Sequence, residues 1–167
     1  GNNSDLKLVL DGLPAPLLSG SGSPPIDGHN HGGNINFDLV AVGADPEDGR
    51  GPLVVHYEHN TGKWERLNTG QTGDLWWIMD HVIDETFYMA GANGLILRYD
   101  EGSGEFERMK TPGGKLLFGI WGTDAEHLWA VGGDLSDEDA GGAVWKLDGG
   151  QWVVDAQAAA VRPEGLP

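Results

Sequence analysis

The stretch HLWAVG, at residues 127–132, decides the fold, because the chain contains it three times in degenerate form. The other two copies are DLVAVG at 38–43 and TFYMAG at 86–91. Their closing glycines are 48 and then 41 residues apart (from 43 to 91, and from 91 to 132). A repeat of roughly 40–50 residues, built from short apolar segments bounded by glycine, is typical of a β-propeller blade.

Further short segments surround each copy in the same order, and they indicate four strands in each unit. The first is rich in glycine and large apolar residues, as expected for the innermost strand of a blade, where backbones approach closely. The upstream segments are 17–22, 75–79 and 117–122, and the downstream ones are 52–57, 62–64, 94–100, 104–106, 142–148 and 150–152. We therefore expect an all-β protein, a β-propeller with about three four-stranded blades that belong to a six- to eight-bladed ring.

The repeat also predicts how the chain is divided. The expected parts are a tether and first strand (1–12), blade one (13–71) with a histidine-containing insertion (24–36), blade two (72–111), blade three (112–155) and a lead-in to a further blade (156–167). Three blades do not close a ring of the usual four to eight. Either a second polypeptide or a second copy of the chain would complete it. The second polypeptide is favoured, because the sequence stops within a repeat.

The third unit carries a more specific likeness. It reads WGTDAEHLWAVG at 121–132 and WKLDGGQW at 145–152. This resembles the W-G-x-x-x-x-D-x-W-A-V-G repeats of secreted bacterial propeller proteins, many of them lipoproteins of myxobacteria, although His127 stands where that family usually has aspartate. The likeness covers roughly residues 13 to 155. It implies an exported protein that is periplasmic, anchored to the outer membrane or extracellular, and it implies no particular ligand.

The charge balance argues against nucleic acid as a partner. The chain has 26 acidic residues against 10 lysines and arginines, a formal net charge of −16. Domains that bind nucleic acid carry a basic footprint instead. The chain contains no cysteine, which excludes disulfides, thiolate metal sites and cysteine nucleophiles.

The insertion at 24–36 predicts one candidate metal site. His29 and His31 are two residues apart, so both imidazoles lie on one side of an extended segment. Together with Asp27 they could bind Zn²⁺ or Cu²⁺, with a further ligand from one of the histidines at positions 56, 59 and 81. The alternative, which the Gly/Pro/Asn-rich composition favours, is a polar loop that binds no metal.

Two acidic loops predict a second candidate metal site. Both connect the second and third strands of a unit, over 44–50 and 133–140. Their aspartates could supply oxygen ligands to Ca²⁺, which takes six to eight of them. These aspartates are Asp45, Asp48, Asp134, Asp137 and Asp139. The spacing is not that of an EF-hand, and the alternative is a pair of solvated acidic loops.

Trp76, Trp77 and Trp121 are the candidate ligand-binding residues. Trp76 and Trp77 are adjacent on a strand, so their side chains face opposite ways. One should pack between sheets, whereas the other could line the channel or the rim and contact a sugar or a protein. The alternative is that both belong to the core.

No catalytic constellation is recognisable in the sequence. The chain has no G-x-S-x-G elbow and no glycine-rich phosphate loop leading into a helix. We therefore predict a non-catalytic propeller module that binds a ligand, either a carbohydrate or a protein. The alternative is a metal-binding propeller with a carrier or enzymatic role, which would use Ca²⁺, Zn²⁺ or Cu²⁺.

Overall fold

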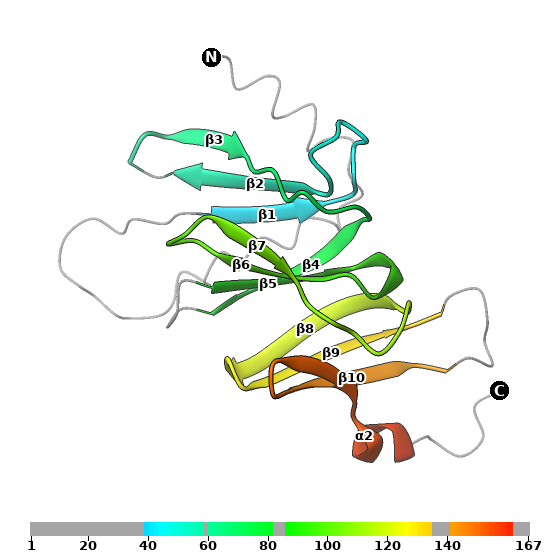
Figure 1. Cartoon of the computed structure of the whole chain (residues 1–167). Coiled ribbons are helices and arrows are strands. Elements are labelled where there is room, and N and C mark those ends of the chain that lie inside the picture. The colour runs from blue at the N-terminus through cyan, green and yellow to red at the C-terminus, as the bar shows by residue number, and fades with distance from the viewer. Residues whose placement is uncertain (1–38, 59, 82–85, 135–140, 162–167) are drawn as a thin grey trace.

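A computed structural model describes residues 39–58, 60–81, 86–134 and 141–161 of the chain (Figure 1). These residues form three antiparallel β-sheets and very little helix. The expected all-β class is therefore confirmed. The described residues do not form a closed propeller or barrel.

The first sheet has the strand order β1-β2-β3. Its strands are β1 (Leu39–Gly43), β2 (Leu53–Glu58) and β3 (Lys63–Arg66). They pair antiparallel, with Tyr57 opposite both Leu39 and Trp64. The innermost strand that the repeat predicts at 17–22, like the tether at 1–12, lies outside the described residues.

The second and third sheets are four-stranded meanders, as the repeat predicts. The second contains β4 (Leu75–His81), β5 (Thr86–Gly91), β6 (Ile96–Asp100) and β7 (Glu105–Arg108), with a 3-10 turn (Ala92–Gly94) between β5 and β6. The third contains β8 (Leu116–Asp124), β9 (His127–Gly133), β10 (Ala143–Asp148) and β11 (Gln151–Val154).

The two four-stranded sheets share one register along their first two strands. Leu75 lies opposite Gly91, and Leu117 lies opposite Gly132. The pairing then shifts by one residue in both sheets, between residues 75 and 77 and between residues 117 and 119. Because the register agrees, the residues of β4 and β5 have structural equivalents in β8 and β9, and their exposure can be compared position by position.

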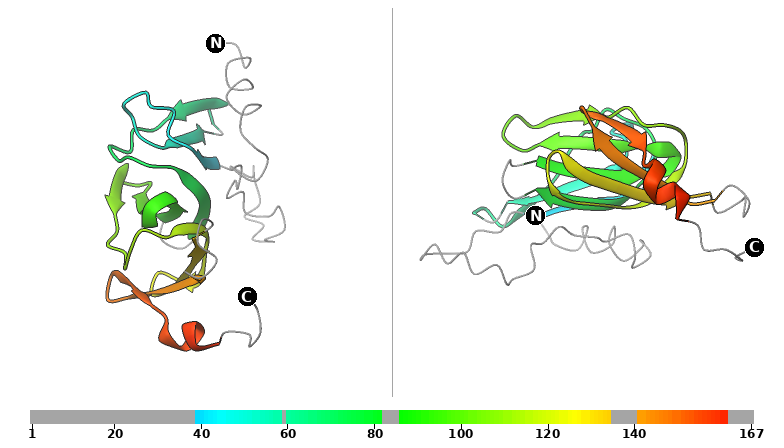
Figure 2. Two further views of the ribbon diagram at one scale, coloured as in Figure 1. Left: turned by 90° about the vertical axis from the view of Figure 1, so that its right-hand side faces the viewer. Right: turned by 90° about the horizontal axis from the view of Figure 1, so that it is seen from below.

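The sheets are stacked face to face in chain order, with the second sheet between the other two (Figures 1 and 2). The face of a sheet toward the preceding sheet is named its leading face, and the opposite face is named its trailing face. Successive side chains of a strand alternate between these two faces. A strand in such a stack is therefore apolar on both sides, rather than on one.

Two buried clusters hold the stack together, one at each contact between sheets. The first joins the trailing face of the first sheet to the leading face of the second, and its members are Val40, Val42, Val54, Leu75, Ile78, Phe87, Met89, Leu95, Leu97 and Tyr99. The second joins the second and third sheets, through Tyr88, Ala90, Ile96, Met109, Leu117, Ile120, Leu128, Ala130, Ala143, Trp145 and Trp152.

A short helix, α2 (Ala156–Ala160), follows the third sheet where the sequence predicts a lead-in to another blade. Asp155 caps it, because its Oδ1 accepts hydrogen bonds from the backbone N–H groups of Gln157 (3.0 Å) and Ala158 (3.1 Å). The segment 162–167 lies outside the described residues. Within the described part of the chain, no helix is both long and apolar enough to cross a bilayer.

Candidate functional site

The trailing face of the third sheet exposes large apolar side chains to solvent. Trp121 on β8 lies directly opposite Trp129 on β9, and Val131 lies opposite Gly119. The exposed fractions are 67% for Trp121, 36% for Trp129 and 47% for Val131. Phe118, in the bulge of β8, is also exposed. Clusters of exposed aromatic and aliphatic residues of this kind mark interaction surfaces.

These side chains line a groove with a volume of about 410 Å³, named here the aromatic groove. Trp77 of β4 completes it from the second sheet, and its indole N–H donates a hydrogen bond to the carbonyl of Ile120 (3.0 Å). That bond orients the Trp77 ring against β8, the first strand of the third sheet. The groove therefore depends on two sheets and not on one strand alone.

Comparison with the other sheets shows that this exposure is confined to the third. Val42, Ala90 and Val131 occupy the same position in the three copies of the repeat, and their exposed fractions are 1%, 0% and 47%. The position two residues earlier behaves in the same way, with 0% for Val40, 4% for Tyr88 and 36% for Trp129. In the first two sheets these positions are covered by the next sheet.

Asp155 fixes one side of the groove. Its Oδ2 accepts a hydrogen bond from the indole N–H of Trp129 (3.1 Å), while its Oδ1 caps α2. The pKa of Asp155 is lowered, first by the backbone hydrogen bond from Ala158 and then by the one from Trp129. The carboxylate is therefore ionised at neutral pH, which strengthens its hold on the indole.

The structure places two of the three candidate tryptophans in this groove. Trp77 and Trp121 line it, whereas Trp76 is half-buried in the bulge of β4. The indole nitrogen of Trp76 is buried, and the described residues give it no hydrogen-bond partner. Sequence reasoning missed Trp129 and Phe118. The repeat could have identified Trp129, because this residue aligns with residues of the other two copies that pack against the next sheet.

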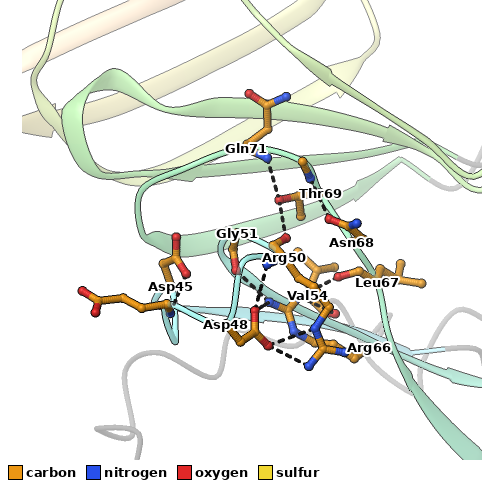
Figure 3. A network of polar contacts seen from close by, with 12 residues as sticks. Asp45, Asp48, Arg50, Gly51, Val54, Arg66, Leu67, Asn68, Thr69 and Gln71 are labelled. Carbon is orange, nitrogen blue, oxygen red and sulfur yellow. Dashed lines mark hydrogen bonds and ion pairs between the residues drawn. The ribbon is translucent and has the colours of Figure 1, made fainter.

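The first acidic loop, between β1 and β2, is part of a network of hydrogen bonds within the protein (Figure 3). Asp48 accepts from Arg50 three times, at the backbone N–H (2.9 Å), Nε (2.9 Å) and Nη2 (2.7 Å). Arg66 of β3 reaches the same carboxylate at 3.9 Å and donates to the carbonyls of Gly51 (2.7 Å) and Leu67 (2.6 Å). Both oxygens of Asp48 are thus engaged by arginine.

Arg50 and Arg66 compensate the negative charge of Asp48. The side-chain hydrogen bond from Arg50 is the main cause of the lowered pKa of Asp48, and burial lowers the pKa of Arg66. Asp45 accepts from the backbone N–H of Glu47 (2.8 Å), and its own N–H donates to Asp74 (2.9 Å). The loop is therefore ordered by protein groups, and the geometry gives the calcium interpretation no support here.

The remaining candidate metal ligands divide between described and undescribed segments. Asp27, His29, His31, Asp137 and Asp139 lie outside the described residues. Asp134 is exposed at the end of β9, in a different sheet from Asp45 and Asp48. Among the described residues, no three or more His, Asp or Glu side chains are gathered so that they could hold a metal ion.

One His–Asp pair lies in the turn between β8 and β9. Asp124 accepts from the ring Nδ1 of His127 (2.7 Å) and from the backbone N–H groups of Glu126 and His127 (both 3.0 Å). Hydrogen bonding, with the His127 side chain as the main cause, lowers the pKa of Asp124 to about 2. A carboxylate with so low a pKa is a weak general base at neutral pH. The pair is therefore better suited to stabilise the turn than to act in catalysis.

Comparison with known proteins adds no family to this picture. No protein-family model matches the chain. No curated protein and no solved structure is significantly similar to it either. What the protein does must therefore be inferred from its own repeat and its own surfaces.

Proposed function

We propose that this chain is a segment of a β-propeller that serves as a non-catalytic protein-binding module of an exported protein, and that it binds through the trailing face of the third sheet. The observation that carries the proposal is the exposure of Trp129 and Val131. Their equivalents in the first two sheets are buried against the next sheet. The third sheet repeats this apolar trailing face but has no following sheet to cover it within the described residues, and an exposed apolar face of this kind is typical of a protein-binding surface.

Three features support the propeller. The two complete sheets are four-stranded antiparallel meanders, and the sheets stack face to face in chain order. The first strand of the second sheet, β4, makes its contacts outside that sheet with β8, the first strand of the third, and with β1. First strands that lie side by side, and a middle sheet covered on both faces, are features of the arrangement of propeller blades.

The chemistry of the groove favours a protein over a carbohydrate. None of the residues that line it has a charged or amide side chain. The indole N–H groups of Trp77 and Trp129 already donate to Ile120 and Asp155. A sugar would need polar groups that fix its hydroxyls, whereas an apolar protein surface needs only shape and burial.

The test is the native mass of the protein isolated from its own source without denaturation, compared with its denatured mass. We expect a stoichiometric complex with a polypeptide. Val131→Lys places a charge on the trailing face and should abolish the complex, because an unpaired charge in an apolar contact is costly. Val154→Lys is the matched control, since Val154 is 53% exposed on the outer strand β11 of the same sheet.

Two results would contradict the proposal. One is a single chain with no partner in the native measurement. The other is a complex that survives Val131→Lys as well as it survives Val154→Lys, which would place the contact on another surface.

A further inference from the structure

We propose that the partner is a second copy of this chain, whose first sheet packs its leading face on the trailing face of the third sheet. The inference rests on the proposed function and names the partner of that same surface. It predicts a head-to-tail contact, in which the two surfaces that meet are different surfaces of the chain.

The leading face of the first sheet resembles the leading face of the second sheet, which is the face that packs against the first sheet. In the first sheet Leu39, Tyr57 and Trp64 lie in one row across the strands. In the second sheet the same row consists of Phe87, Tyr99 and Phe106. Each row ends in an aromatic pair, with ring centroids 5.2 Å apart for Tyr57 and Trp64 and 4.4 Å apart for Tyr99 and Phe106.

These two rows differ in how far they are covered. Phe87 and Tyr99 are 6% and 5% exposed, because they are buried against the first sheet. Their equivalents Leu39 and Tyr57 are only half-buried, while Trp64 and its equivalent Phe106 are half-buried in both rows. The first sheet therefore carries an apolar leading face of the type that accepts another sheet, and that face is incompletely covered.

The trailing face of the third sheet is the complementary surface. Trp121 and Trp129 take the positions that Met79 and Tyr88 take in the second sheet, where they pack against the third. One chain thus presents both halves of a contact that it already makes twice internally. A second copy supplies the missing half at each end, which an unrelated protein would match only by coincidence.

Such a contact closes on itself. Head-to-tail contacts form a ring where the rotation between copies closes, and open filaments where it does not. Two copies bring together six sheets through two identical contacts, and six lies within the four to eight blades of propellers. The expected assembly is therefore a dimer with a two-fold axis and no tendency to form longer chains.

The experiment is sedimentation velocity on the purified chain alone, with two variants that each spoil one face. Val131→Lys alters the trailing face and Leu39→Lys the leading face, while Val154→Lys is the control. We expect dimers for the unaltered chain and the control. Each face variant by itself should be monomeric. An equimolar mixture of the two should regain an open dimer held by one contact, because the intact leading face of one variant meets the intact trailing face of the other, while the second contact brings the two altered faces together and stays broken.

A cooperative thermal unfolding transition in each variant shows that the loss of the dimer is not a loss of fold, although a monomer is expected to unfold at a lower temperature than a dimer. Tyr57→Ser replaces Leu39→Lys if that variant shows no cooperative transition. A monomeric unaltered chain would overturn the inference, and so would a dimer that resists both leading-face variants. In either case the proposed function still stands if the protein from its own source carries a different polypeptide on the trailing face. Absence of any complex in both experiments would overturn both.

Discussion

The glycine that ends the second and third copies of the repeat is required by space rather than by backbone conformation. At Gly91 a Cβ atom would fall on the carbonyl of Asp74, and at Gly132 on the carbonyl of Leu116. Leu116 begins β8 and Asp74 immediately precedes β4, so both carbonyls lie where the first strand of a four-stranded sheet begins. The glycine lets the first two strands of the sheet approach each other just before the shift in register.

Replacing this glycine should therefore destabilise the protein. We expect Gly132→Ala to lower the free energy of unfolding by roughly 1–3 kcal/mol, the usual cost of overpacking. Gly114→Ala is the control, because nothing lies within 4 Å of a Cβ atom at that position. Urea unfolding of both variants measures the difference. Equal stability of the two would contradict the close approach seen here.

At the scale of the element, β9 shows how one strand serves two contacts. Leu128 and Ala130 point toward the second sheet and are fully buried, whereas Trp129 and Val131 point away and are exposed. A strand that is apolar on both faces is typical of a sheet covered on both sides. Within the described residues a neighbouring sheet covers the third sheet on its leading face only, and beyond that sheet the short helix α2 contacts β10.

The two faces of β9 should consequently respond differently to truncation. We expect Leu128→Ala to cost roughly 2–5 kcal/mol of stability, because it leaves a cavity in the contact between the second and third sheets. Val131→Ala should change the stability of the monomeric chain by no more than about 0.5 kcal/mol, as at other surface positions. Denaturant unfolding at low protein concentration compares them. A large loss for Val131→Ala would show that its face is already covered within the monomer.

For the whole molecule, net charge disfavours the association of two copies, whereas exposed apolar surface favours it. The chain carries a formal charge of −16, so two copies repel each other over long distances. The aromatic groove that we propose as part of their contact is lined by uncharged side chains. Association of the two copies is therefore expected to depend on apolar burial and to proceed against electrostatic repulsion.

Salt should accordingly strengthen the dimer. Raising the ionic strength from about 0.01 M to about 1 M shortens the Debye length from about 30 Å to about 3 Å, which screens the repulsion between the copies. We expect the dissociation constant from sedimentation equilibrium to fall over this range. A dissociation constant that rises with salt would indicate a contact held by ion pairs and would contradict the apolar interface.

The sequence by itself determined the short strands and the four-stranded unit, which the structure shows in the second and third sheets. These follow from local information, namely short apolar segments, the glycines that separate them and their recurrence at a nearly constant period. The sequence also identified Trp77 and Trp121 as candidate binding residues, and the structure places both in the aromatic groove.

Only the tertiary structure decided which apolar residues are left uncovered and which acidic residues are already paired. Val42, Ala90 and Val131 look alike in sequence, and a neighbouring sheet alone makes the first two buried and the third exposed. Asp48 is paired with its near neighbour Arg50, but the sequence does not show that Arg66, from another strand, also comes within 3.9 Å of the same carboxylate. Burial and the contact with Arg66 depend on groups far apart in the chain, and a local pattern does not contain them.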